Sequence, residues 1–324
     1  MQSVNGIAYW VYQYQNLSTK KRIREMLGRV DDEEANLRVE ALRERIQRQN
    51  DAVRQAKQLA LLGYQLADAK TYAVVAALAN QQLFEKGLTL VGSHAYSVLL
   101  NTLGVFVSSP VQTFDVDVSR THRIAVPELD LAKLLAETGI TFVPVPAFNP
   151  RDPSTSFKER GTSQLQVDLL VPSETDEIGF VGVPELNAYA TTLPLLDFLV
   201  EDSFMAVLAS RVGVVNVRVP DPARMAIHKL AVSQMRVNMR DKSAKDIQQA
   251  CVLLAVLESN RPADVSLALE SLPRAAATRV LQALPAVSAV LGEEGEAIVE
   301  GLRADIEARV SAIESVSHVT KPKG

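Results

Sequence analysis

The pattern of apolar and polar positions changes twice between residues 88 and 119, from a strand to a helix and back to a strand. A short apolar run leads into Gly92-Ser93, a helix-length apolar segment follows, and a second strand carries Asp115 and Asp117. Because strand side chains alternate between the two faces, these two acids share one face. The pattern directs three other residues toward a core, namely Phe114, Val116 and Val118.

Residues 6–28 alternate as two strands and predict a β-hairpin with a turn at 16–18. One strand carries aromatic residues on one face, and the return strand carries basic residues on one face. The aromatic side chains could simply pack on the body of the protein. Alternatively, they could form a nucleic-acid platform, since stacking and phosphate contacts require these two residue types together. The residues concerned are Trp10, Tyr12 and Tyr14, with Lys20, Arg22 and Arg24.

A long uninterrupted helix is predicted over 31–62, with acids at its start, and a second helix over 68–85. The first helix has an apolar seam near heptad spacing, which fits packing on its own chain or, less readily, a dimerising coiled coil. The seam consists of Val39, Leu42, Ile46, Val53 and Ala56.

Another alternating segment predicts a hairpin, with strands around 156–159 and 164–171. Asp168 lies on the polar face of the second strand, opposite four apolar residues. It is a third acid on a strand, after Asp115 and Asp117. The segment 120–150 between them reads as a small α/β unit with a helix over 129–138. The four apolar residues are Leu165, Val167, Leu169 and Val171.

From Asp221-Pro222 onward the chain is nearly all helical, because an acid followed by proline is a strong helix start. Breaks are expected near 260–262 and 272–273. The fold class is therefore α+β. We divide the chain into an N-terminal hairpin and helical region (1–85), a mixed-sheet core (86–220) and a C-terminal helical domain (221–324).

Composition narrows the class of protein further. With 324 residues and 47% hydrophobic content, the chain can bury a sizeable core. The net charge of −4 means that any basic surface must be local. The single cysteine, Cys251, excludes an intramolecular disulfide and a cysteine-based zinc site. We find no basic, apolar leader and no apolar stretch of about 18 residues, so we expect a cytoplasmic protein without a membrane partner.

The Gly-Ser turn and the three acids form a joint pattern that suits phosphoryl transfer. Backbone N–H groups at a helix N-terminus can hold phosphates, and carboxylates can hold divalent ions. In order along the chain, Gly92-Ser93, Asp115-Val116-Asp117 and Asp168 resemble the polymerase-β-type nucleotidyltransferase superfamily. The chain is similar to a bacterial branch that is related to minimal and toxin-type nucleotidyltransferases. The resemblance covers about residues 86–172.

This resemblance implies a role for each matching residue. Gly92 and Ser93 would contact the nucleotide triphosphate. Asp115 and Asp117 would ligate two Mg²⁺ ions, and Asp168 would ligate one of them and act as base toward the acceptor hydroxyl. We expect the strands of these acids to be neighbours in one sheet, with all three carboxylates within reach of one metal ion.

Basic residues elsewhere are secondary candidates for nucleotide binding. Four residues recur at helical spacing and would form one face, either solvated or in contact with phosphate. They are Lys229, Ser233, Arg236 and Arg240, and Lys245 and Asp246 start the next helix. Lys158 and Arg160 on the hairpin before Asp168 could also reach phosphate. His94 and His228 are expected to be structural.

The resulting hypothesis is a metal-dependent enzyme that moves a nucleoside monophosphate from an NTP to an acceptor hydroxyl and releases pyrophosphate. The acceptor could be an RNA 3′ end such as that of tRNA, a protein side chain or a small molecule. Such a protein could act as a toxin or defence effector with an antitoxin partner. The alternative is a catalytically silent interaction module on the same scaffold.

Overall fold

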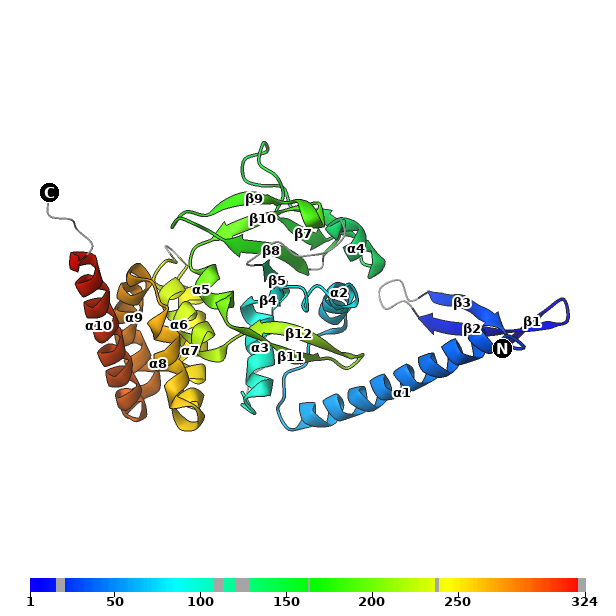
Figure 1. Cartoon of the computed structure of the whole chain (residues 1–324), viewed down its shortest axis with the longest axis horizontal. Helices are drawn as coiled ribbons and strands as arrows, with labels where there is room; N and C mark the ends of the chain where they lie inside the picture. Colours follow the sequence, from blue (N-terminus) through cyan, green and yellow to red (C-terminus); the bar gives the residue numbers. More distant parts are fainter. Residues whose placement is uncertain (16–20, 108–112, 121–128, 163, 237–238, 320–324) are drawn as a thin grey trace.

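A seven-stranded mixed sheet forms the centre of the computed structural model (Figure 1), which describes residues 1–15, 21–107, 113–120, 129–162, 164–236 and 239–319. Five strands lie in one path and two more continue from β8. The order is β4 (Leu88–Leu90), β5 (Asp115–Arg120), β8 (Gln166–Pro172), β10 (Ala188–Leu193) and β9 (Gly179–Val183), with β7 (Ser156–Glu159) paired to β8 and β6 (Phe142–Pro144) paired to β7.

The strand register brings the predicted acids together. β5 and β8 are parallel neighbours, and Asp117 is directly paired with Asp168. β7 runs antiparallel on the other side of β8 and pairs Ser156 with Asp168. Asp168 therefore lies in the middle of the sheet, and the predicted adjacency of the two acid-bearing strands is confirmed.

Alternation along these strands accounts for the core beneath the acids. The side chains of Val116, Val118, Val167 and Leu169 are buried, as their positions opposite the acids predict. The expectation for Phe114 is wrong, because it precedes the first residue of β5 and is 52% exposed. A residue outside the paired strand is not held to the face that alternation assigns.

Two of the helices on the sheet begin at side-chain caps that the sequence supplies, Asp68 and Asp130. Asp68 accepts hydrogen bonds from the N–H groups of Lys70 and Thr71, at 2.8 and 3.2 Å, and so starts α2 (Ala69–Asn80). A cap of this kind contributes about 1 kcal/mol. The other two helices of this region are α3 (Gly92–Thr102) and α4 (Leu131–Glu137).

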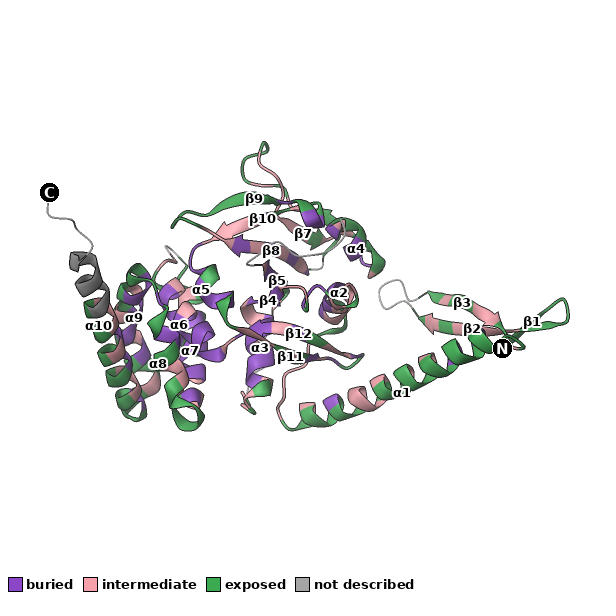
Figure 2. Ribbon diagram, in the orientation of Figure 1, coloured by how far each residue is buried: buried purple, intermediate pink, exposed green. Residues whose placement is uncertain are grey.

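The N-terminal region is a three-stranded sheet followed by one long helix. β2 (Ile7–Gln15) and β3 (Arg22–Arg29) form the predicted hairpin, and β1 (Gln2–Val4) adds a third strand to β2. The predicted turn at 16–18 and Lys20 lie outside the described residues. α1 (Glu33–Leu61) confirms the predicted helix and extends away from the sheet (Figure 1), with most of its surface exposed (Figure 2).

Two further elements link the sheet to a bundle of C-terminal helices. The hairpin of β11 (Ser203–Ala209) and β12 (Val214–Pro220) follows the short helix α5 (Leu196–Glu201). Asp221 caps α6 with Pro222 at its first position, as predicted. The helices of the bundle are α6 (Pro222–Ser233), α7 (Arg240–Asn260), α8 (Pro262–Glu270), α9 (Arg274–Leu291) and α10 (Glu296–Val319), with a short 3₁₀ turn at Gly292–Gly295. A second 3₁₀ turn, Pro184–Leu186, lies between β9 and β10 of the central sheet.

One stretch of the described residues, Arg274–Ser311, is long and apolar enough to cross a membrane by length and composition alone. It contains two helices, because the turn at Gly292–Gly295 separates α9 from α10. Arg309 Nε on α10 donates to the carbonyl of Leu272, just before α9, at 3.5 Å. α10 therefore returns alongside α9 (Figure 1), and the apolar run serves the packing of this helix pair.

Candidate active site

The three predicted acids lie on one face at the start of two parallel strands. Asp115 and Asp117 alternate along β5, and Asp168 stands beside Asp117 on β8, where neighbouring strands are about 4.8 Å apart. Gln166 Nε2 donates to Asp168 Oδ1 at 2.8 Å. The sheet thus places three carboxylates on one face where two strands begin, and the apolar residues of the same strands lie on the opposite face.

Gly92 packs directly against this cluster. Its φ of +65° is in the left-handed region, and a Cβ built on it would lie 2.1 Å from Asp117 Oδ2. Any side chain at this position would displace the carboxylate. The backbone N–H of Val91 also donates to the carbonyl of Asp117 at 2.9 Å. A Gly at 92 is therefore required both by conformation and by the close approach of α3 to β5.

The N-terminus of α3 lies over the acids without a side-chain cap. The first N–H groups of a helix have no partner inside the helix and carry a partial positive charge. Ser93 follows Gly92 at this end, and its Oγ accepts a hydrogen bond from Lys245 Nζ at 3.2 Å. The arrangement suits a bound anionic group, as the resemblance implies for these two residues.

Electrostatics show that the acids repel one another. Burial, followed by the charges of Asp168 and Asp115, raises the pKa of Asp117 to about 7. Burial and the charge of Asp168 also raise the pKa of Asp115. Acids whose charges are disfavoured by the fold point to a partner of opposite charge, and strongly perturbed pKa values cluster at functional sites.

Carboxylate oxygens are the ligands that Mg²⁺ prefers, so the donor set of this cluster suits that ion. The charges of Lys229 and Lys242 lower the pKa of Asp117, but burial and the charges of Asp168 and Asp115 outweigh them. Among the described residues, however, no group of three or more His, Cys, Asp and Glu side chains is arranged to hold a metal. The expectation that all three carboxylates lie within reach of one ion is therefore not met in the structure.

The secondary candidates divide into those near the acids and those held elsewhere. Lys158 on β7 is exposed and pairs in register with Gln166, and its charge lowers the pKa of Asp115. Arg160 is exposed beyond the end of β7. Within the described residues, its guanidinium makes no contact that connects it with the acids.

The prediction that the four residues from Lys229 to Arg240 share one helical face is wrong, because α6 ends at Ser233. Lys229 is buried on α6, and its Nζ donates to Asp246 Oδ1 at 3.0 Å. Arg236 lies beyond the helix and donates to Asp246 Oδ2 at 2.7 Å. Burial raises the pKa of Asp246, but the charges of Lys229 and Arg236 outweigh it, so the net shift is downward. These two cations therefore hold Asp246 in its ionised form.

A pocket of about 450 Å³ is lined both by Asp117 and by the ion-paired residues Lys229, Arg236 and Asp246. Its wall includes Gly92 and Asp117 from the sheet side and residues of α6 and α7 from the helical side. The pocket lies between the two layers, which is where ligand sites commonly form. The lining residues with charged groups are Asp117, Lys229, Arg236, Asp246 and Asp176.

Two lysines lie near the acids, namely Lys245, which the sequence pattern places at a helix start, and Lys242, which the pattern does not single out. Lys242 and Lys245 are exposed on α7, and the charges of both lower the pKa of Asp115. Their i, i+3 spacing at the start of a helix is the signal that could have found them. Without the fold, nothing shows that this helix end lies beside β5.

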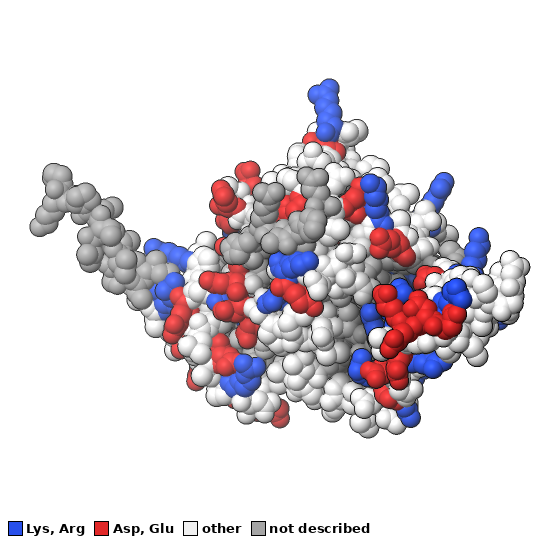
Figure 3. Space-filling view, turned by 45° about the vertical axis from the view of Figure 1, so that its right-hand side comes forward, with Lys and Arg blue, Asp and Glu red and all other residues white. Residues whose placement is uncertain are grey.

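The N-terminal hairpin does not gather its aromatic and basic residues on one described face. Tyr12 and Tyr14 stack at 5.2 Å, and they pair across the hairpin with Glu25 and Ile23. Arg22 and Arg24 pair instead with Gln15 and Gln13, on the opposite face. Acidic and basic side chains are also interspersed on the face in Figure 3. Trp10 instead connects the hairpin to α1, because its Nε1 donates a hydrogen bond to Asn36 Oδ1 at 2.6 Å.

Comparison with known families agrees with this geometry. A family model described as nucleotidyltransferase matches residues 69–273. This is more than half of the chain, and the chain therefore belongs to this nucleotidyltransferase family. No curated protein matches it.

A solved structure that the chain resembles is an antigenic nucleotidyltransferase-like protein from Paracoccidioides brasiliensis. The two are 16% identical, with a TM-score of 0.36, and the match covers 68% of this chain and 91% of the other. The family assignment rests on the sequence match rather than on this structural overlap.

Proposed function

We propose that the protein is a magnesium-dependent nucleotidyltransferase that moves a nucleoside monophosphate from an NTP to an acceptor hydroxyl. The observation that carries the proposal is the direct pairing of Asp117 with Asp168 beneath the N-terminus of α3. Family membership supports nucleotidyl transfer in general. The metal, the nucleotide and the acceptor are our extension from the site.

The position of each residue in the site indicates its role in the proposed reaction. Gly92 and Ser93 present backbone N–H groups to the phosphates, and Lys245 and Lys242 reduce the negative charge on that side. Lys229 and Arg236, fixed by Asp246, form the wall of the nucleotide pocket. Binding of Mg²⁺ would require Asp115, Asp117 and Asp168 to move closer together, and the ion would then neutralise the charge that develops on the transferring phosphate.

The reaction is a single displacement at phosphorus. The acceptor oxygen forms a bond to the α-phosphorus while the bond from that phosphorus to the bridging oxygen breaks. Pyrophosphate leaves with the bonding electron pair, and the acceptor proton passes to Asp168. A carboxylate on the central strand suits this role, because it lies beside Asp117 and receives only one hydrogen bond that the structure shows, from Gln166.

The test is incubation of the protein with Mg²⁺, each labelled NTP in turn, and either total RNA or a cell lysate. We expect label on an acceptor with the wild type and none with Asp115→Ala or Asp117→Ala. Exposed Glu258 on α7 supplies a control, since Glu258→Gln changes a surface acid away from the site. A wild-type protein that binds neither NTP nor metal would favour the silent interaction module instead.

We propose RNA as the acceptor class, and a toxin or defence role would follow from modification of an essential RNA. Induced expression in a bacterial host is then expected to arrest growth, and Asp117→Ala to relieve the arrest. Growth arrest that persists with Asp117→Ala would separate any toxicity from the chemistry.

A further inference from the structure

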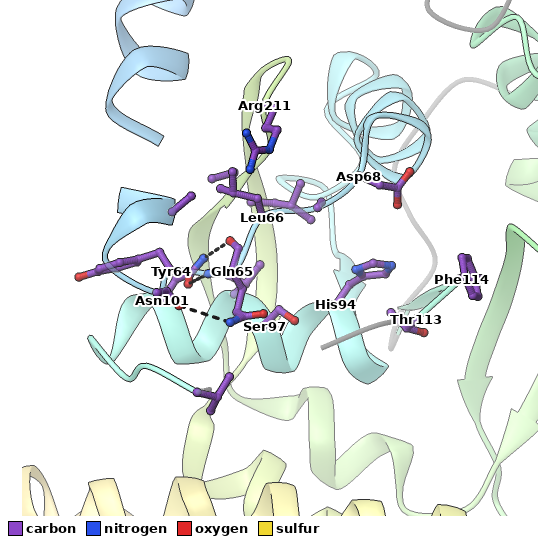
Figure 4. Close-up of a pocket in the computed structure, with 17 residues that line it drawn as sticks. Tyr64, Gln65, Leu66, Asp68, His94, Ser97, Asn101, Thr113, Phe114 and Arg211 are labelled. Atoms are coloured by element: carbon purple, nitrogen blue, oxygen red, sulfur yellow. Dashed lines mark hydrogen bonds between the residues drawn. The ribbon is translucent and has the colours of Figure 1, made fainter. Parts of the chain in front are cut away.

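A second pocket, of about 580 Å³, lies on the other side of the acid cluster (Figure 4). It is bordered by α3, the residues before β5, the linker between α1 and α2, and the turn between β11 and β12. Neither the nucleotide pocket nor the proposed mechanism so far uses these residues. Its lining includes Tyr64, His94, Ser97, Phe114 and Arg211 (Figure 4).

Hydrogen bonds between the elements that line this pocket hold its walls in place. Asn101 on α3 accepts from the N–H of Gln65 and donates to its carbonyl, both at 2.8 Å (Figure 4). The N–H of Ala67 donates to the carbonyl of Ala209 at 2.9 Å. These bonds hold the linker to α3 on one side and to the β11–β12 hairpin on the other.

His94 Nε2 is a buried polar atom of this wall without a hydrogen-bond partner among the described residues. The side chain of His94 is only 6% exposed. Leaving a buried polar atom without a hydrogen bond is unfavourable, and a ligand hydroxyl or amide would supply the missing partner. Burial lowers the pKa of His94 to about 4, so a neutral imidazole faces the ligand. The expectation that His94 is merely structural does not account for this free nitrogen.

The two pockets flank the acids along both segments that build the site. On α3, Gly92 lines the nucleotide pocket and His94 lines the second pocket, with Ser93 between them. On and before β5, Asp117 lines the nucleotide pocket and Phe114 lines the second, with Asp115 between them. A transferase of two substrates needs its reacting groups between two binding sites, and this geometry supplies both.

The lining chemistry indicates what would bind in the second pocket. Phe114 is 52% exposed beside Asp115, and an exposed aromatic ring next to a site can stack on a base. Arg211 is exposed on the β11–β12 turn, and among the described residues its guanidinium has no ion pair, so it is available for phosphate. Tyr64 adds a second ring, which contacts Phe106 edge-on at 5.0 Å.

From these observations we propose that the second pocket is the acceptor site and that it binds a nucleoside 5′-phosphate unit. Its base lies against Phe114, its phosphate pairs with Arg211, and His94 Nε2 hydrogen-bonds a polar group of the nucleoside. The unit is either a free nucleotide or the 3′-terminal residue of an RNA chain. This inference rests on the proposed function and adds the acceptor to it.

Binding measurements test the proposal without any catalytic step. Calorimetry with AMP, GMP, CMP and UMP probes free nucleotides, and fluorescence polarisation with 5′-labelled tetraribonucleotides that have a free 3′-hydroxyl probes RNA ends. Ser97→Phe fills the second pocket from α3, and Thr102→Phe on the same helix is the size-matched control outside it. Val232→Phe fills the nucleotide pocket instead.

We expect Ser97→Phe to abolish binding of at least one of these probes while leaving NTP binding unchanged, and Val232→Phe to do the reverse. Binding of tetraribonucleotides but not mononucleotides identifies an RNA end, and binding of mononucleotides alone identifies a free nucleotide. Arg211→Glu, on an exposed turn where folding is not at risk, is expected to weaken the same probe about tenfold or more, since charged hydrogen bonds contribute about 1.5–3 kcal/mol. Arg151→Glu, exposed in a loop, is its charge-matched control.

The proposal is overturned if neither probe binds the wild type, or if Ser97→Phe and Arg211→Glu bind the probes as the wild type does. Either result would leave the nucleotidyltransferase proposal standing, provided that NTP still binds. Loss of NTP binding in the wild type itself would instead contradict the proposed function.

Discussion

Replacing Asp117 by asparagine should stabilise the metal-free protein at pH 8, although it removes a residue on which the proposed activity depends. The pKa of Asp117 is raised from 3.8 to about 7 by burial and by the charges of Asp168 and Asp115. At 1.36 kcal/mol per unit of pKa, its ionised form carries a cost of about 4 kcal/mol. Asparagine has nearly the same shape and carries no charge, so this cost disappears.

The sign of the pH dependence follows from the direction of the shift. A carboxyl group whose pKa is raised by folding binds its proton more tightly in the folded state. Its contribution to stability is present below about pH 4 and is lost as the pH rises through about 7. The gain from Asp117→Asn should therefore be largest at pH 8 and should vanish near pH 4.

Thermal unfolding in the presence of EDTA measures this effect. The new amide must find hydrogen-bond partners beside Gly92, so we expect a net gain of about half of the charge cost. This is about 2 kcal/mol, or roughly 3 °C in Tm for a chain of 324 residues. Glu258→Gln, at an exposed position, should change Tm by far less. Adding Mg²⁺ should raise the Tm of the wild type and have little effect on Asp117→Asn. An equal or lower Tm for Asp117→Asn at pH 8 would refute the reasoning.

Three further substitutions test other parts of the site. Gly92→Ala adds a Cβ 2.1 Å from Asp117 Oδ2 at a φ of +65°. We expect the free energy of unfolding, measured in urea, to fall by about 1–2 kcal/mol and nucleotidyl transfer to be lost. An active Gly92→Ala protein would show that the close approach is not needed. Lys229→Met leaves the buried carboxylate of Asp246 with one cation fewer. The free energy of unfolding, measured in urea, should therefore fall by about 3 kcal/mol. Unchanged stability would mean that Arg236 alone satisfies the carboxylate. Lys245→Ala, at an exposed position, should change stability by less than about 0.5 kcal/mol but raise the KM for NTP several-fold, and an unchanged KM would exclude this lysine from phosphate binding.

Much of the fold is predictable from local pattern. Alternation along 164–171 places four apolar residues under the sheet, and the structure buries Leu165, Val167, Leu169 and Val171. Asp68 and Asp221 begin helices because each side chain caps the N–H groups that follow it. These signals lie within a few residues of each other, so no knowledge of tertiary structure is needed.

The parts that the sequence does not predict depend on contacts between distant segments. Lys229 lies at helical spacing from Arg236, but α6 ends between them and both cations are held by Asp246 on α7. The hairpin aromatics and arginines each alternate correctly, but only the strand register shows that they face opposite sides. His94 lacks any distinguishing spacing, and its unsatisfied nitrogen is visible only in the folded chain.

The position of the label during transfer tests the central claim most directly. The wild type is incubated with Mg²⁺, RNA and NTP labelled either at the α- or at the γ-phosphorus. We predict that RNA gains label only from the α-labelled nucleotide, while the γ label appears in pyrophosphate. Label on RNA from the γ position would show phosphoryl transfer and contradict the account, as would α-label transfer that persists in Asp117→Ala.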